Sequence, residues 1–185
     1  MNPACRIWSS MSRQFRTDRP PGAQLHVFTA RMLDPNTLLH KAFVNPALPA
    51  PAFNDRAFHA AEIPAANGIT NARSLARMYA ATIGEVDGVR LLSPETLDDA
   101  TRQQSAGEDV VLGYETRYAT GFQLSFPFRP MAGEGSFGHY GMGGSVGFAH
   151  PGRGFAFAYV MNQMLPSGGV DPRTRNLIET LLGCL

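Results

Sequence analysis

The chain has 185 residues, of which 44% are hydrophobic and 17% charged, and its net charge is +1 at pH 7. These values are ordinary for a soluble globular domain with its own core, and they argue against a disordered chain. The basic residues are dispersed along the sequence. That excludes the clustered positive charge expected of a protein that binds nucleic acid or an anionic membrane surface.

Cysteine and histidine spacing excludes further classes of site. Cys5 and Cys184 lie at opposite ends of the chain, and the five histidines form no pair with metal-ligand spacing. We therefore expect no disulfide, no metal and no cofactor. No apolar run approaches the roughly 20 residues that span a bilayer, and the Arg- and Ser-rich residues 1–19 lack the apolar region of a secretory signal. These features predict a cytoplasmic protein with no membrane partner.

The first half of the chain is predicted to be loop-rich, followed by two helices. Residues 20–66 contain seven prolines, which favours loops with one short helix near 36–43. An apolar face at helical spacing, between the N-cap Asn71 and a terminating Gly84, predicts a helix over 72–83. Ser93 as N-cap, followed by proline and glutamate, predicts a second helix from 93 to about 103.

From residue 111 onward the apolar pattern changes to a period of two, which is typical of strands. We expect strands near 118–126, 136–141, 144–150 and 154–162, the last two joined by a tight turn at "HPGRG". Asp171 and the apolar stripe that follows it predict a closing helix over 171–183 that covers one face of the sheet. The fold class is therefore predicted as α/β of the α+β type, an antiparallel sheet flanked by helices.

The stretch Gly143-Gly144-Ser145-Val146-Gly147 reads as the G-x-S-x-G turn that carries the nucleophile of α/β-hydrolases. That turn requires a helix after the serine, and then an acid and a histidine in that order. Here β-rich residues follow Ser145, and His150 precedes Asp171. The sequence thus favours a glycine hairpin in which Ser145 begins the next strand.

Several stretches in order resemble the C-terminal part of serine β-lactamase-like hydrolases. They are "NGITNARSLARMYA", "LLSPETL", "GFQL", "GHYGMGGSVGFAHP" and "GFAFAYVMN". The similarity is greatest to the class C β-lactamase and family VIII carboxylesterase branch. It implies a partial β-lactamase/transpeptidase-like fold, with a loop-rich N-terminal segment over 1–63 and the C-terminal part of the hydrolase domain over 64–185.

The resemblance also shows what this sequence lacks. Members of the family carry a Ser-x-x-Lys box for the nucleophile and a Tyr-x-Asn or Tyr-x-Ser box that assists proton transfer. The single lysine here, Lys41, has Leu38 three residues before it, and no tyrosine is followed two residues later by Asn or Ser. Because a serine hydroxyl needs an activating base, we expect no catalytic residue in this chain.

The third box of the family, Lys-Thr-Gly in β-lactamases, matches His139-Tyr140-Gly141 in altered form. A mostly neutral imidazole pairs weakly with a β-lactam carboxylate, so the resemblance implies a small ester substrate. By the same match Met142 would offer its backbone N–H to the oxyanion. His139, Tyr140, Gly141 and Met142 are therefore the predicted substrate-binding residues. The alternatives are that His139 is a polar residue at a strand edge and that Tyr140, across the pleat, is structural.

The sequence leaves three functions open. The first is the C-terminal portion of a carboxylesterase-like serine hydrolase that is cut off from its nucleophile half by truncation, a frameshift or the choice of gene model. The second is a non-catalytic binding module that retains the half-fold, and the third is a hydrolase that uses Ser145 in an unrelated way. In the complete family fold the strand matching 154–162 pairs with N-terminal strands, which predicts possible self-association through an exposed edge.

Overall fold

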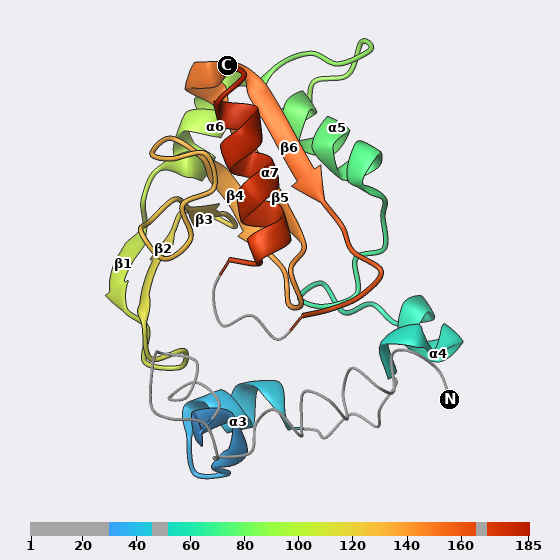
Figure 1. Ribbon diagram of the computed structural model, residues 1–185, viewed down its shortest axis with the longest axis vertical. Coiled ribbons are helices and arrows are strands. Elements are labelled where there is room, and N and C mark those ends of the chain that lie inside the picture. The colour runs from blue at the N-terminus through green and yellow to red at the C-terminus, as the bar shows by residue number, and fades with distance from the viewer. Residues whose placement is uncertain (1–29, 46–51, 166–169) are drawn as a thin grey trace. The chain divides into compact units, whose positions relative to one another are not determined.

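The computed structural model describes residues 30–45, 52–165 and 170–185 (Figure 1). The opening residues 1–19 and Cys5 lie outside these ranges, so the predictions about them remain predictions. Cys184 lies inside them, as an exposed free thiol. The chain divides into two compact units, one formed by residues 1–69 with 109–114 and the other by residues 70–108 with 115–185.

Within residues 30–45 and 52–69, the first unit contains short helices. Helix α3, Leu38–Phe43, confirms the predicted helix near 36–43, and Thr37 caps it by accepting a hydrogen bond from the His40 N–H (3.2 Å). A 3-10 turn over Ala52–Asn54 and helix α4, Arg56–Ala60, were not predicted. At five residues α4 is too short for a helical period to show in the sequence.

The second unit is built on one antiparallel sheet of six strands, each paired with the next in the sequence. The strands are β1 Ser105–Glu108, β2 Glu115–Tyr118, β3 Gln123–Leu124, β4 Phe137–Tyr140, β5 Val146–His150 and β6 Phe155–Tyr159. This arrangement confirms the predicted fold class. The last three strands form the predicted meander, each slightly shorter than expected.

The single strand predicted over 118–126 is wrong. The chain turns there, because Gly121 has a φ of +81° and the Ala119 N–H donates to the Phe122 carbonyl (2.8 Å). Two strands, β2 and β3, result instead of one. Strand β1 was also missed, since all four of its residues are exposed and carry no apolar alternation.

Three helices flank the sheet, and their caps are the predicted ones. Helix α5 spans Ala72–Ile83, α6 spans Pro94–Thr101 and α7 spans Pro172–Leu182. The side chains of Asn71, Ser93 and Asp171 accept hydrogen bonds from backbone N–H groups in the first turn of α5, α6 and α7 respectively. Each cap satisfies a donor that the helix itself leaves free, which explains why the starts were predictable.

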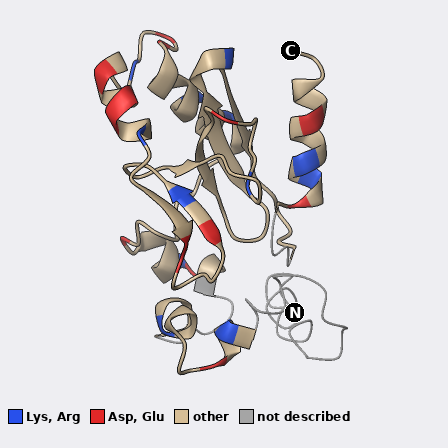
Figure 2. Ribbon diagram, turned by 90° about the vertical axis from the view of Figure 1, so that its left-hand side faces the viewer, with Lys and Arg blue, Asp and Glu red and all other residues tan. Residues whose placement is uncertain are grey.

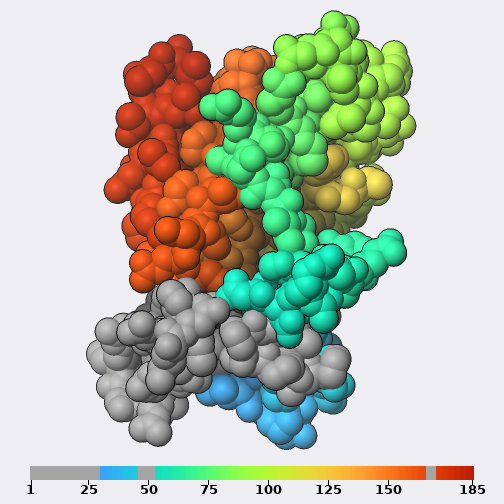
Figure 3. All heavy atoms as spheres, turned by 90° about the vertical axis from the view of Figure 1, so that its right-hand side faces the viewer, coloured from blue at the N-terminus to red at the C-terminus, as the bar shows by residue number. Residues whose placement is uncertain are grey.

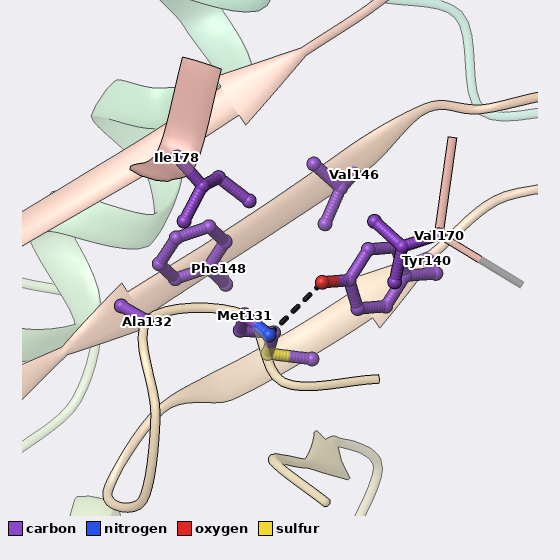
Figure 4. Close-up of a cluster of buried hydrophobic side chains, with 7 residues drawn as sticks. All are labelled: Met131, Ala132, Tyr140, Val146, Phe148, Val170 and Ile178. Atoms are coloured by element: carbon purple, nitrogen blue, oxygen red, sulfur yellow. Dashed lines mark hydrogen bonds between the residues drawn. The ribbon is translucent and has the colours of Figure 1, made fainter. Parts of the chain in front are cut away.

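The alternation of side chains along β4 and β5 gives the sheet two separate cores. On the side of α5 and α6, Tyr79 and Leu97 pack against Phe137 and Ala149. On the side of α7, Figure 4 shows the second cluster, composed of Met131, Ala132, Tyr140, Val146, Phe148, Val170 and Ile178. Phe137 and Phe148, one in each core, are completely buried.

Strand β6 is the last strand of the sheet, and within the described ranges only β5 pairs with it. Its five residues are all half-buried, because α5 lies against one side and the α7 core against the other. Figure 3 shows α5 in green, with residues in the orange of the last strands reaching the surface between it and the red α7.

Candidate active-site hairpin

Residues 141–145 connect β4 to β5 in a tight turn. The Gly141 N–H donates to the Ser145 carbonyl (2.8 Å), and the Gly144 N–H donates to the Gly141 carbonyl (3.4 Å). Gly143 and Gly144 have φ angles of +83° and +118°, a region that favours glycine. A Cβ on Gly141 would collide with the Ser145 Oγ. The glycines therefore shape a hairpin, as the sequence indicated.

Ser145 lacks the surroundings of a nucleophile. Strand β5 begins directly after it, where an α/β-hydrolase would have a helix. His150, the only histidine that follows, lies at the other end of β5, about 16 Å away at 3.3 Å per residue. Asp171 is already paired with Arg173 (2.7 Å). In the part of the chain that the structure describes, no hydrogen bond joins Ser145 to a histidine.

His139 lies on β4 opposite Gly147 and is exposed. Residues in register share a face of the sheet, and a Cβ on Gly147 would lie 2.6 Å from the Tyr79 ring, so His139 is on the α5 side. The pKa of His139 is lowered, first because surrounding protein removes part of the ring from water and second because of the positive charge of Arg129. The lowered pKa favours the neutral form of the imidazole at pH 7.

Tyr140 points to the opposite side of the sheet and is buried, 5% exposed. Its hydroxyl accepts a hydrogen bond from the Met131 N–H (2.9 Å), drawn as the dashed line in Figure 4. The Arg129 guanidinium lies over the ring, 5.2 Å from its centroid. Burial raises the pKa of the Tyr140 phenol. These contacts describe a core residue that fixes the 129–132 loop, which is the structural alternative considered for it.

Met142 follows Gly141 at the turn, and its side chain projects from the surface with 48% exposure. Its backbone N–H makes no hydrogen bond to any residue within the described ranges. A free backbone donor at a glycine turn is what an oxyanion site requires. His139, Gly141 and Met142 are thus close neighbours along the chain at the end of β4, while the Tyr140 side chain lies on the opposite face of the sheet from that of His139. Their substrate-binding role stays a prediction.

The sequence did not predict the residues of α7 that hydrogen-bond the hairpin. Thr174 is completely buried and donates from Oγ1 to the Gly144 carbonyl (2.9 Å). Arg173 reaches the Gly143 carbonyl (3.5 Å) while it binds Asp171. In Figure 2 a red segment and blue segments lie next to one another where the C-terminal helix begins. Asp171 was predicted only as a helix cap, and no sequence signal links residue 174 to residue 144.

No three His, Cys, Asp or Glu side chains gather to form a metal site within the residues placed by the structure. The same residues include no helix long and apolar enough to cross a bilayer. The described residues do contain a hairpin that follows the exposed His139 and whose Met142 N–H is not hydrogen-bonded to any of them, carried by an antiparallel sheet with helices on both faces. The sheet and its hairpin agree with the resemblance to the C-terminal part of serine β-lactamase-like hydrolases that the sequence shows.

Comparison with known proteins gives the family. Residues 12–182 match the family described as Beta-lactamase, and the chain therefore belongs to the β-lactamase family. A curated relative, Esterase/beta-lactamase LipL from Mycobacterium tuberculosis, is 43% identical over 108 residues, which are 57% of this chain and 24% of that protein.

Solved structures support the same assignment. A family VIII carboxylesterase superposes with a TM-score of 0.73 at 38% identity, covering 80% of this chain and 40% of that one. A penicillin-binding protein homologue from Caulobacter crescentus gives 0.69 at 37% identity with the same coverage. EstA from Arthrobacter nitroguajacolicus Rue61a gives 0.73 at 28% identity, covering 91% and 44%. The chain thus spans less than half the length of these relatives.

Proposed function

We propose that this chain supplies the substrate-side strand and oxyanion hairpin of a carboxylesterase-type serine hydrolase that acts on small esters. The observation that carries the proposal is the end of β4, where His139 lies three residues before Met142, whose N–H has no hydrogen-bond partner within the described ranges. The names of two relatives, an esterase/β-lactamase and a family VIII carboxylesterase, support the ester class.

The chemistry assigned to these residues is electrostatic. When a serine attacks an ester carbonyl, negative charge develops on the carbonyl oxygen, and the Met142 N–H would donate to that oxygen. His139 would line the site as a neutral ring that can donate or accept a hydrogen bond. A fixed ammonium at the same position would instead attract a carboxylate, which an ester does not carry.

The nucleophile is not assigned to this chain, because its 185 residues contain neither Ser-x-x-Lys nor Tyr-x-Asn/Ser. We therefore expect the purified chain to hydrolyse p-nitrophenyl esters no faster than an unrelated control protein. Turnover that Ser145→Ala abolishes would instead establish the third function, a hydrolase that uses Ser145.

A chimera tests the proposed function directly. Residues 70–185 replace the matching part of the family VIII carboxylesterase, and the family resemblance implies that the Ser-x-x-Lys box lies in the part that is kept. We expect hydrolysis of short p-nitrophenyl esters that falls when His139→Ala is introduced, with Arg153→Ala, an exposed residue in the β5–β6 turn, as the control. A folded chimera that binds but does not hydrolyse the esters would favour the second function, the non-catalytic binding module.

Self-association belongs to the same proposal. The outer edge of β6 has no partner strand in the described part of the chain, and such edges template pairing with another strand. We expect the isolated chain to form dimers or larger species through this edge, detected by light scattering across a concentration series. A monodisperse monomer with a sharp, high-temperature unfolding transition would contradict this self-association.

A cytoplasmic location is likewise proposed, and cell fractionation tests it.

A further inference from the structure

We propose that the start of α7 is a positioning element for the hairpin, in which Asp171, Arg173 and Thr174 hold the Gly143-Gly144 backbone so that the Met142 N–H keeps one orientation. The inference rests on the proposed function, since that N–H has catalytic meaning only where a substrate carbonyl meets it. The physical arrangement itself is independent of any activity.

Thr174 makes the shortest link between α7 and the hairpin. Its side chain is completely buried, and its Oγ1 donates to the Gly144 carbonyl at 2.9 Å. A buried carbonyl that loses its donor keeps the full cost of leaving water, so this bond holds the turn against α7. Residues 144 and 174 are 30 positions apart, and the contact therefore exists only in the folded chain.

The ion pair beside Thr174 fills the space behind the turn. The Asp171 side chain is 0% exposed, and Arg173 binds both of its oxygens, from Nε at 2.9 Å and from Nη2 at 2.7 Å. The carboxylate occupies the position that a Cβ on Gly144 would need. A planar, two-point pair of this kind fixes direction as well as distance.

The segment before α7 holds the other half of the turn. The Leu165 N–H donates to the Gly143 carbonyl at 3.1 Å, and the Met164 side chain would lie 2.6 Å from a Cβ on Gly143. Arg173 joins this segment to the hairpin, because its Nη1 donates to the Gln163 carbonyl at 3.1 Å. The carbonyls of Gly143 and Gly144 are thus both hydrogen-bonded, by residues of α7 and by Leu165 before it.

The other side of the turn is left open. The Met142 side chain is exposed, and its N–H has no partner within the described ranges. A donor held rigidly by its neighbours and free of its own bond needs no rearrangement when an oxyanion forms. Asp171, Arg173 and Thr174 are therefore positioning residues and not catalytic ones, because they act through the backbone of Gly143 and Gly144.

The test measures the backbone ¹⁵N order parameter of Met142 in the full, deuterated chain. A rigid amide gives about 0.85 and a flexible one less than about 0.6. We expect the wild-type Met142 value near the upper figure. Thr174→Val should lower it below about 0.6, and Thr174→Ser, which keeps the hydroxyl, should restore it.

Matched variants separate this role from general stability. Thr180 lies exposed on α7 and donates only to the Asn176 carbonyl of its own helix, so Thr180→Val should leave Met142 unchanged. Arg173→Lys, which keeps the charge but loses the two-point pair, should lower the Met142 value, while Arg175→Lys at an exposed site should not. If Thr174→Val fails to fold, the Arg173→Lys result decides.

Three results would overturn the proposal. They are a wild-type Met142 value below about 0.6, a Met142 value that neither Thr174→Val nor Arg173→Lys changes, and an equal loss of order throughout β4 and β5 in these variants. The order-parameter measurement therefore tests only the positioning role, and the chimera's ester hydrolysis tests the proposed function. An inactive chimera with an ordered Met142 would refute the proposed function alone.

Discussion

The two faces of the sheet are held by different means. On the α5 side the contacts are apolar and close, and Gly147 lets the Tyr79 and Leu75 side chains approach within 2.6 and 3.0 Å of where its Cβ would lie. On the α7 side an apolar cluster around Phe148 ends in a polar anchor formed by Asp171, Arg173 and Thr174.

The difference follows from what each helix meets. Helix α5 lies across paired strands whose backbone groups are already bonded to one another, so only side-chain shape matters there. The start of α7 meets a turn, where carbonyls point away from the sheet and need donors. The α5 face should therefore be sensitive to added atoms and the α7 face to lost hydrogen bonds.

Gly147→Ala should have the largest effect on the free energy of unfolding. The new Cβ would lie 2.6 Å from the Tyr79 ring and force α5 away from β5, at a cost of about 3 kcal/mol. Urea titration measures the change. Gly84→Ala is the matched control, since nothing lies within 4 Å of a Cβ there, and an equal loss in both variants would contradict close packing as the cause.

Asp171→Asn should destabilise the α7 face by about 2 kcal/mol at pH 7, because the buried carboxylate accepts charged hydrogen bonds from Arg173. Those bonds hold the pKa of Asp171 below its ordinary value. Their stabilisation is present above about pH 4 and is lost as the pH falls through the folded pKa. The difference between wild type and variant should therefore shrink in acid.

The control for this prediction is Asp98→Asn on the exposed side of α6, which should change stability by less than about 0.5 kcal/mol. Urea titrations of the wild type and both variants between roughly pH 2.5 and 7 measure the change in the free energy of unfolding. A wild-type and variant difference that stays constant down to the lowest pH would show that the charge of Asp171 is not responsible.

His139→Gln should have a smaller effect, visible only as a pH dependence. The pKa of His139 is lowered in the folded protein, so the unfolded chain takes up the proton first as the pH falls below about 6.5. Wild-type stability should then decline more than that of the variant between about pH 7 and 5. Thermal melts measure it, and parallel curves over that range would disprove the shift.

Arg77→Ala should have the smallest effect. Arg77 pairs with Asp87 on the surface, where the two side chains are 55% and 68% exposed. Such exposed pairs contribute at most about 1 kcal/mol, in contrast to the buried pair of α7. Urea titration with and without added salt measures it. A loss comparable to that of Asp171→Asn would remove the distinction between the two ion pairs.

Some features of this protein were determined by its sequence alone. The starts of α5, α6 and α7 followed from Asn71, Ser93 and Asp171, because a cap bonds to backbone within three residues and needs no other part of the fold. The meander of β4 to β6 followed from the alternation of apolar residues and the glycine turns between the strands. The third-box match His139-Tyr140-Gly141 could likewise be read directly.

Other features were decided only by the tertiary structure. Gly121 divides an alternating stretch into β2 and β3, and β1 exists because β2 supplies its hydrogen bonds, not because its own side chains are apolar. The alternation of side chains placed His139 and Tyr140 on opposite faces, but only the folded structure shows that the Met131 N–H donates a hydrogen bond to the Tyr140 hydroxyl. The anchoring of Gly144 by Thr174 joins residues 30 positions apart, and such a bond leaves no periodic or local signal because its geometry is created by the fold itself.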